Sequence, residues 1–191
     1  KIWILGFDPK AQQPLSPQNK PDEKLDAPFI DVAGFTENAP SPDYNDNVAA
    51  VYPTGVEVSA DGQSLFVANN LGDTLGIVSD VRDTRKITRL SIRRPGSTQF
   101  VYPYDVKILT SGARVSKVYV SLWGDGSIAV VNPNLQNRLS HIVVDRHPTA
   151  MLFDRQKTRL FVVNSNADRV SVIETSTDKV IETIDPSPRE T

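Results

Sequence analysis

A four-part pattern that recurs three times is the feature that most limits how this chain can fold. A proline opens each unit, at residues 53, 103 and 148, and four short apolar runs follow it. In the first unit these runs are residues 55–59, 64–68, 74–79 and 86–92. Clusters of Asp, Asn and Gly separate them, and these residues favour tight turns, so the runs predict antiparallel strands. Four antiparallel strands repeated at this period are typical of β-propeller blades.

The distribution of apolar residues within each unit agrees with blades. The second runs, "LFVA", "VYVSLW" and "LFVV", are apolar on both faces, as strands stacked between two neighbouring blades require. The fourth runs, "KITRLSI", "RLSHIVV" and "KVIETI", alternate and carry more charge, which protects an outer edge against pairing with other chains. Helical periodicity is not sustained anywhere. The predicted fold class is therefore all-β, a β-propeller of four-stranded antiparallel blades.

The same pattern predicts how the chain is divided. Residues 51–100, 101–146 and 147–191 are each expected to form one blade. In residues 1–50, "KIWILGF" predicts a third strand and "APFIDVA" a fourth, with a long proline-rich insertion, so this segment is expected to hold half a blade. All these parts belong to one propeller domain of about three and a half blades, a partial ring. We therefore expect the rest of the propeller, or another chain, to cover the open blade faces.

Composition narrows the possible partners. The net charge of −2 disfavours binding to nucleic acid through a general basic surplus. No apolar run approaches the roughly 20 residues that cross a bilayer, so no membrane span is predicted. The absence of cysteine excludes disulfides, thiolate metal sites and cysteine nucleophiles.

Residues 51–184 resemble the YVTN-type propeller repeat, whose units carry a proline, an apolar strand, an Asp-Gly turn, "LYVAN", a "VSVID"-like strand and a last strand. "GVEVSADGQSLFVANNLGDTLGIV" and "RLFVVNSNADRVSVIETSTDKVIETI" carry the resemblance, which extends weakly over residues 1–33. The "FDP" insertion followed by "YPTG" is similar to YncE-like propellers that precede a phosphoesterase domain in exported bacterial proteins. The resemblance implies a periplasmic or extracellular location. The second unit departs from the pattern, because "TSGARVS" replaces its Asp-Gly turn and predicts a longer hairpin.

The loops after the second and fourth strands of a blade emerge at one end of a propeller, where ligands commonly bind. The candidate residues for binding a ligand or partner in these loops are Asn69, Asn70, Tyr104, Trp123, Asp125, His147, Asn164 and Asn166. A polar rim with flat aromatic contacts suits a sugar, a peptide or a partner loop. The alternative interpretation is that each Asn serves its own turn and that Trp123 fills space between blades.

No catalytic arrangement is predicted. The chain has two histidines, His141 on a fourth strand, where an outward position is expected, and His147, which could face the channel mouth. Two histidines without supporting spacing do not make a nucleophile, base and orienting group. "WGDG" and "NSNADR" lack the ligand spacing of a calcium loop, so neither a metal nor another cofactor is predicted. Glu57 and Asp105 are expected near the inner strands, where they could line the central channel.

Residues 81–94 hold six basic side chains against one acid. These candidates for a basic outer strand are Arg82, Arg85, Lys86, Arg89, Arg93 and Arg94. They could bind an anionic polymer such as single-stranded nucleic acid, or they could protect an outer edge strand with charge. The stretch has no aromatic residue for base stacking, which favours edge protection.

Three functions are consistent with these features. The first is a non-catalytic recognition or scaffold domain that binds a protein or a small polar ligand at its loop face. The second is the propeller portion of an enzyme, either a phosphoesterase fusion or a lactonase- or lyase-like propeller. The third is binding of single-stranded nucleic acid, the least favoured of the three.

Overall fold

The computed structural model describes residues 2–3, 7–8, 13–14, 29–30, 52–81, 86–133 and 139–186. The chain divides into two compact units, Lys1–Ala49 and Ala50–Thr191. In the first unit, β1 (Ile2–Trp3) pairs antiparallel with β4 (Phe29–Ile30), and β2 (Phe7–Asp8) pairs with β3 (Gln13–Pro14). The pairing of β1 with β4 joins the two segments expected to form half a blade. The half blade itself stays a prediction, because the residues around these strands lie outside the described part.

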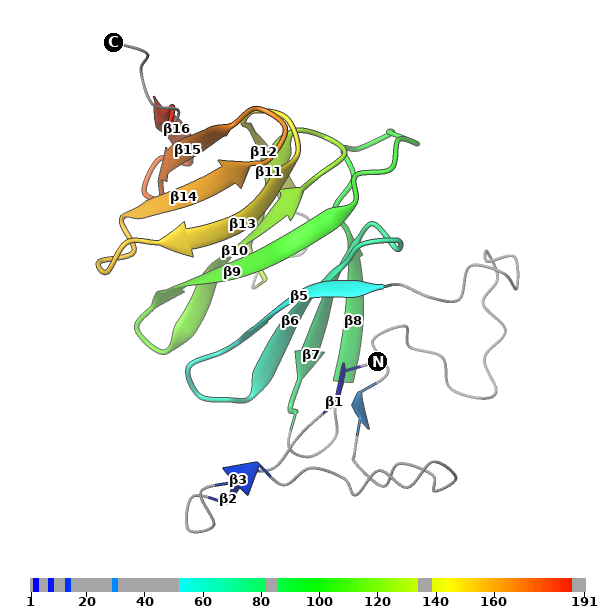
Figure 1. Ribbon diagram of the computed structural model, residues 1–191. Helices are drawn as coiled ribbons and strands as arrows, with labels where there is room; N and C mark the ends of the chain where they lie inside the picture. Colours follow the sequence, from blue (N-terminus) through cyan, green and yellow to red (C-terminus); the bar gives the residue numbers. More distant parts are fainter. Residues whose placement is uncertain are drawn as a thin grey trace. The chain divides into compact units, whose positions relative to one another are not determined.

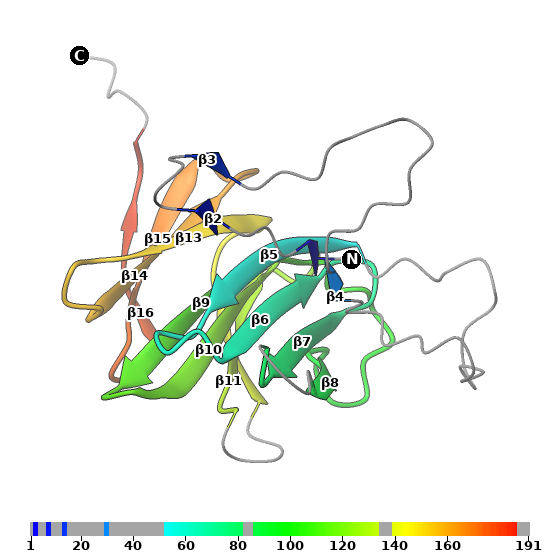
Figure 2. The same ribbon diagram turned by 90° about the horizontal axis from the view of Figure 1, so that it is seen from below.

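Three four-stranded antiparallel sheets form the second unit, and each has its strands in sequence order. Blade 1 contains β5 (Pro53–Val58), β6 (Ser64–Asn69), β7 (Thr74–Ser79) and β8 (Lys86–Ser91). Blade 2 contains β9 (Pro103–Ser111), β10 (Arg114–Leu122), β11 (Ser127–Val131) and β12 (Leu139–Val143). Blade 3 contains β13 (Pro148–Phe153), β14 (Arg159–Asn164), β15 (Arg169–Glu174) and β16 (Lys179–Ile184). Figures 1 and 2 show three separate sheets, with the inner strands β5, β9 and β13 next to one another.

The turns form where Asp and Gly residues predict them. Between β5 and β6, the Asp61 carboxylate accepts hydrogen bonds from the Ser59 hydroxyl at 2.6 Å and the Gln63 amide at 3.0 Å, while Gly62 has a φ of 68°. In blade 2 the insertion lengthens β9 and β10 to nine residues each, and the hairpin turns at Gly112, with a φ of 62°. The described residues contain no helix long and apolar enough to cross a membrane.

The residue before each of the three blade-opening prolines has a left-handed backbone. Tyr52, Tyr102 and His147 have φ angles of 47°, 48° and 54°. Their carbonyls accept hydrogen bonds from the amides of Asn70, Trp123 and Ser165, the first residue after the second strand of each blade. A non-glycine residue with positive φ carries strain, so the same conformation at three equivalent sites indicates that the blade junction requires it. We call these three the pre-proline residues.

The core consists of two layers between consecutive blades. One face of blade 2 packs on blade 1 through Val106, Val120 and Leu122, which meet Phe66 and Leu75. The other face packs on blade 3 through a second cluster made of Tyr119, Ile128, Val130, Ile142, Met151, Leu160, Val162 and Ile173. Both faces of blade 2 are therefore apolar, which confirms the interpretation of its second run as a strand stacked between two blades.

The outer faces of blades 1 and 3 are less covered than the faces that lie between blades. Val56 of blade 1 and Val106 of blade 2 occupy equivalent positions. Val56 pairs with the residue two places before the end of β6, and Val106 pairs with the residue two places before the end of β10. Val56 is 53% exposed, whereas Val106 is fully buried. On blade 3, Val163 is 43% exposed, whereas the equivalent Ala68 of blade 1 is fully buried. Each end of the three-blade stack thus exposes a position that is buried between blades, although Val67 and Val78, on the same face of blade 1 as Val56, are fully buried.

Candidate functional site

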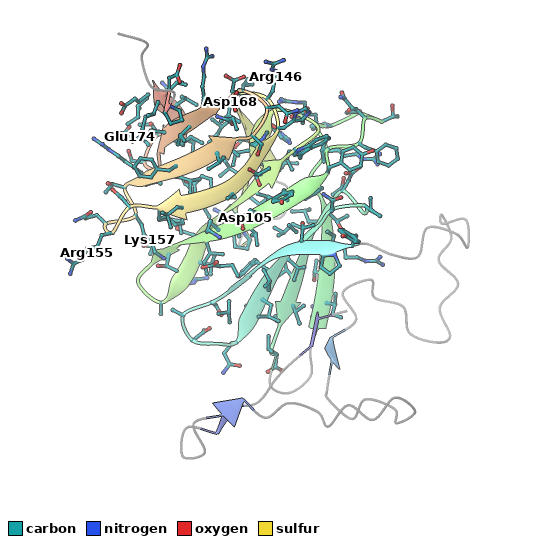
Figure 3. The ribbon with its side chains drawn as sticks, in the orientation of Figure 1. Asp105, Arg146, Arg155, Lys157, Asp168 and Glu174 are labelled. Carbon is teal, nitrogen blue, oxygen red and sulfur yellow. The ribbon has the colours of Figure 1, made fainter. Side chains whose placement is uncertain are left out.

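The end of the blades that carries the turns after β6, β10 and β14, together with the β8–β9 and β12–β13 connections, is called the loop end here. Figure 3 shows Arg146 and Asp168 at this end of blade 3, with Arg155 and Lys157 at the opposite end. All eight candidate binding residues lie in or next to loop-end segments. The opposite end, with the β5–β6, β9–β10 and β13–β14 turns, is called the hairpin end.

Two of the candidates serve their own turns. Asn69 and Asn164 are buried, and their side-chain amides donate to the Thr74 hydroxyl at 3.1 Å and the Ser171 hydroxyl at 2.9 Å. Their main-chain carbonyls accept the turn amides of Gly72 and Ala167. Both side chains are therefore buried within their own turns, which is the arrangement that the alternative interpretation expects.

A row of contacting rings crosses the loop end from blade 1 to blade 3. The Trp123 indole stacks on the His147 imidazole, with ring centroids 4.0 Å apart and 18° between the planes. Tyr102 meets Trp123 edge-on at 6.1 Å, and Phe100 stacks on Tyr102 at 5.9 Å. The Arg93 guanidinium lies over Phe100, 4.8 Å from its centroid. We call these five residues the aromatic row.

The aromatic row is partly open to solvent. Phe100 is 53% exposed and Trp123 is 38% exposed. The β10–β11 turn approaches the row so closely that a Cβ on Gly124 would lie 2.8 Å from the Phe100 carbonyl oxygen and 2.9 Å from the Tyr102 ring. Glycine at this position thus lets the turn carry Trp123 against its neighbours, with part of each ring left accessible.

A buried carboxylate fixes the connection that carries half of the aromatic row. Oδ1 of Asp73 accepts the main-chain amides of Val101 at 3.0 Å and Tyr102 at 2.9 Å. Oδ2 pairs with Arg93, 2.6 Å from one terminal nitrogen and 2.8 Å from Nε. Asp73 has a φ of 48°, which Asp tolerates better than most residues. This single side chain therefore positions the arginine at one end of the row and the backbone of the tyrosine at its centre.

Asp125 holds the same connection from the next turn. Its carboxylate accepts a two-point contact from Arg94, with nitrogen–oxygen distances of 3.2 and 2.9 Å, and a hydrogen bond from the Ser127 hydroxyl. Burial alone would raise the pKa of Asp125, but the hydrogen bonds from Arg94 and Ser127 outweigh it and hold the pKa below its ordinary value. Asp125 is thus a structural anchor beneath the loop surface.

Of the remaining candidates, Asn70 makes a contact between two blades, whereas Tyr104 and Asn166 lie on the surface. The Asn70 amide donates to the Pro103 carbonyl at 2.9 Å, which ties blade 1 to blade 2. Tyr104 on β9 and Asn166 in the β14–β15 turn are exposed. His141 departs from the outward position expected for it, because it is half-buried and its Nε2 lies 3.0 Å from the Ile92 carbonyl oxygen.

The basic side chains of residues 81–94 do not form one strip. Strand β8 ends at Ser91, so Arg93 and Arg94 lie in the connection that follows it, where both pair with carboxylates. Lys86 and Arg89 are exposed on β8 itself. Arg82 and Arg85 lie outside the described residues. Binding of single-stranded nucleic acid therefore has at most two described residues of the strand to rest on.

The inner strands are joined by polar contacts. Asp105 accepts the Met151 amide at 2.8 Å and the Lys107 ammonium at 3.0 Å, and Lys107 also lies 3.8 Å from Glu57. Both carboxylates expected near the channel are thus paired with a cation. Within residues 52–81, 86–133 and 139–186, no group of three metal-ligating side chains comes together.

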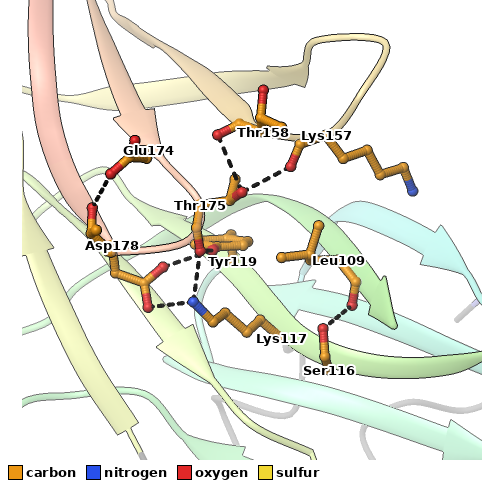
Figure 4. Close-up of polar contacts among 10 residues, drawn as sticks. Leu109, Ser116, Lys117, Tyr119, Lys157, Thr158, Glu174, Thr175 and Asp178 are labelled. Atoms are coloured by element: carbon orange, nitrogen blue, oxygen red, sulfur yellow. Dashed lines mark hydrogen bonds and ion pairs between the residues drawn. The ribbon is translucent and has the colours of Figure 1, made fainter. Parts of the chain in front are cut away.

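A second polar network closes the hairpin end between blades 2 and 3 (Figure 4). Asp178 in the β15–β16 turn accepts hydrogen bonds from the Tyr119 hydroxyl and the Lys117 ammonium, each at 2.7 Å. Lys117 also donates to the Thr175 carbonyl at 2.8 Å. Burial of Tyr119, together with its hydrogen bond to Asp178 and the charge of that carboxylate, raises the pKa of the hydroxyl above its ordinary value. This network is structural and contains no free reactive group.

Sequence reasoning did not identify Phe100 or Tyr102 as part of this end, and it gave Asp73 no role there. The available signal was "FVYPY", where aromatic residues flank the proline that opens blade 2. Only the path of the β8–β9 connection brings these rings to Trp123.

Comparison with known proteins supports the assignment of the fold. No protein-family model matches the sequence, and no curated protein matches it. Among solved structures, hydrazine synthase from Kuenenia stuttgartiensis matches 81% of this chain and 40% of its own length, with a TM-score of 0.62 and 19% identity. A catalytically inactive virginiamycin B lyase from Staphylococcus aureus, in complex with quinupristin, matches 75% and 44%, with a TM-score of 0.57 and 16% identity. The chain has a partial β-propeller fold.

A third match extends the range of activities on this fold. The dihydro-heme d1 dehydrogenase NirN matches 73% of this chain and 29% of its own length, with a TM-score of 0.56 and 14% identity. The chain thus spans less than half the length of each of these proteins. At such identities the likeness concerns the fold alone, and proteins with different activities share this fold.

Proposed function

We propose that this chain is the recognition part of a β-propeller, which binds a protein or a small polar ligand at its loop end and does not itself catalyse a reaction. The aromatic row is the observation that carries the proposal. Exposed aromatic rings supply large contact areas at a low entropic cost, and they are enriched where proteins bind partners. The buried carboxylate of Asp73 and the partly buried carboxylate of Asp125 hold the row in place before any ligand arrives, which reduces the cost of binding.

The chemistry around the row suits a polar ligand with a flat apolar side. Tyr104 and Asn166 add exposed polar groups at the same end. Of the described loop-end carboxylates, Asp73, Asp125 and Asp145 are each paired with arginine, so these three are not available as a general acid or base without breaking an ion pair, whereas Asp168 is exposed. These features favour recognition over chemistry.

We also propose that further propeller blades cover the two outer faces of the three-blade stack. Exposure of Val56 and Val163, at positions buried between the other blades, supports this arrangement. Each face would supply the apolar half of a new interblade core. The YncE-like family and an exported, periplasmic or extracellular, location belong to the same proposal, and they rest on the resemblance of the repeats.

The test is a binding screen with the 191-residue chain. An immobilised oligosaccharide array and a displayed random peptide library supply the probes. We expect Trp123→Ala to weaken the selected binders by about tenfold or more, as for a central aromatic contact, and Trp123→Phe to retain part of the affinity. Val143→Ala, an exposed change on β12, is the matched control and should bind as the wild type does. The proposal fails if neither probe set yields a binder, or if Trp123→Ala and Val143→Ala bind alike.

A second candidate function is the propeller portion of an enzyme. The observation that favours it is the presence of a lyase and a dehydrogenase among the structures with the same fold. Hydrolysis of a simple lactone and of a phosphodiester, measured with the same chain, would separate this candidate from pure recognition. Turnover that Trp123→Ala abolishes and Val143→Ala leaves unchanged would replace the first proposal with this one.

A further inference from the structure

A groove opens between blades 1 and 2 at the hairpin end, away from the aromatic row. It has a volume of about 410 Å³. Its lining residues come from the β5–β6 and β9–β10 turns, from the segment after β11 and from both sheets, and they are Ser59, Asp61, Ser64, Phe66, Ile77, Ser79, Lys86, Thr88, Ala113, Arg114, Val115 and Pro133. Small-molecule sites commonly have volumes of roughly 300–1,000 Å³, so the groove is large enough for a compact ligand.

The floor of the groove consists of two parallel rows of cross-strand neighbours on one face of blade 1. Phe66 pairs with Ile77, and Ile77 pairs with Thr88, which makes the row nearer the core mostly apolar. Two residues further along, Ser64 pairs with Ser79, and Ser79 pairs with Lys86, which makes the outer row polar. The floor therefore changes from apolar to cationic over the distance of one residue pair.

The corresponding space between blades 2 and 3 is closed. Counted from the loop-end turns, Tyr119 of blade 2 is equivalent to Phe66 of blade 1, and Lys117 is equivalent to Ser64. Tyr119 and Lys117 both reach Asp178 of the next blade. Phe66 has no hydroxyl and Ser64 has a short side chain, so neither can make such a bridge. The groove is thus a difference between two equivalent junctions.

The charged groups on the groove indicate what it would bind. Lys86 lies on the blade 1 side and Arg114 on the blade 2 side, and neither forms an ion pair with another described residue. Among the described lining residues the one acid is Asp61, which accepts hydrogen bonds from its own turn. Two cations against one acid favour a singly charged anion, and an arginine is well suited to a carboxylate.

We propose that this groove binds a small amphipathic carboxylate. The carboxylate would lie near Lys86 and Arg114, and the apolar body of the ligand would cover the partly buried Ile77 and Val115, with Phe66 buried beneath them. The site is separate from the loop end and does not depend on the function proposed there.

The test uses 2-naphthoate as the probe and 2-naphthamide as its uncharged counterpart. Titration into the ¹⁵N-labelled chain should shift the amide signals of Ile77 and Val115. We expect 2-naphthamide to bind about tenfold more weakly, because it lacks the charge that strengthens the hydrogen bonds. Arg114→Gln and Lys86→Gln should each weaken 2-naphthoate binding by several-fold to about tenfold.

Arg89→Gln is the matched control. It removes a cation from the same strand as Lys86 without changing a lining residue, and it should leave the affinity for 2-naphthoate unchanged. Ser79→Leu fills the groove and should abolish the shifts while the thermal unfolding curve stays close to that of the wild type. The proposal is wrong if the naphthoate shifts fall on the exposed face around Val163, or if Arg89→Gln and Arg114→Gln have equal effects.

Discussion

Replacement of Asp73 by Asn tests how the loop end is held together. The amide keeps the size of the carboxylate and the tolerance for positive φ, and its oxygen can still accept the amides of Val101 and Tyr102. Its NH₂ group, however, faces the donors of Arg93, so the two charged contacts at 2.6 and 2.8 Å are lost. A hydrogen bond to a charged group contributes about 1.5–3 kcal/mol.

The expected loss in the free energy of unfolding depends on how deeply the two side chains are buried. The Asp73 side chain is 2% exposed, whereas that of Arg93 is 29% exposed and can regain water. We therefore discount the two contacts to a total loss of about 2–3 kcal/mol in the free energy of unfolding. Asp73→Ala also leaves two main-chain amides without an acceptor, and it should cost about 3–5 kcal/mol.

Urea unfolding followed by far-ultraviolet circular dichroism measures these losses. Arg93→Gln and the double variant complete a thermodynamic cycle, which isolates the coupling between the two side chains. Asp125→Asn serves as a comparison, since its partner Arg94 is more exposed, and it should cost about 1 kcal/mol. A loss below about 1 kcal/mol for Asp73→Asn, or no coupling to Arg93, would show that the carboxylate does not anchor the connection.

Three further predictions concern other parts of the second unit. Gly55→Ala should lower the free energy of unfolding by about 1–3 kcal/mol in the urea assay, because the new Cβ would lie 2.8 Å from the Asp105 Cα; wild-type stability would contradict this close approach. Tyr119→Phe should cost about 1–2 kcal/mol through the lost 2.7 Å bond to Asp178, and a cost near zero would mean that the bond contributes nothing net. Because the pKa of Asp125 is lower in the folded state, its carboxylate stabilises the fold above the unfolded-state pKa of about 4, and this contribution is lost as the pH falls through the folded-state pKa. The free energies of unfolding of the wild type and Asp125→Asn, measured against pH, should therefore converge below about pH 4. A constant difference between the two curves would exclude this linkage.

The blades could be predicted because their signals are local. Asp61 and Gly62 turn the first hairpin through contacts within a few residues, and the spacing of Pro53, Pro103 and Pro148 repeats the unit. Strand β7 has the bounds that the apolar run predicts, and the other strands of blade 1 differ by at most two residues. Such features need no knowledge of distant contacts, so a sequence pattern is sufficient.

The candidate site could be predicted only in part, because its signals are not local. Trp123 and His147 were expected at the loop end, but their stacking depends on how the β10–β11 turn crosses the β8–β9 connection. Asn164 looks like a surface ligand in the sequence, yet the turn that it supports buries it. Asp73 gave no distinct signal, because an Asp in a turn has the same appearance whether it faces water or holds a distant segment.

The left-handed pre-proline residues have a consequence for how such an end face can diversify. The junction constrains the backbone at Tyr52, Tyr102 and His147 through their main-chain carbonyls, and at Tyr102 also through the main-chain amide that donates to Asp73. The same conformation already accommodates two phenols and an imidazole, so side-chain identity at these positions is largely independent of the scaffold. Mutation there can exchange the chemical character of the recognition surface while every blade keeps its place, and a library randomised at these three codons would sample new specificities on an unchanged frame.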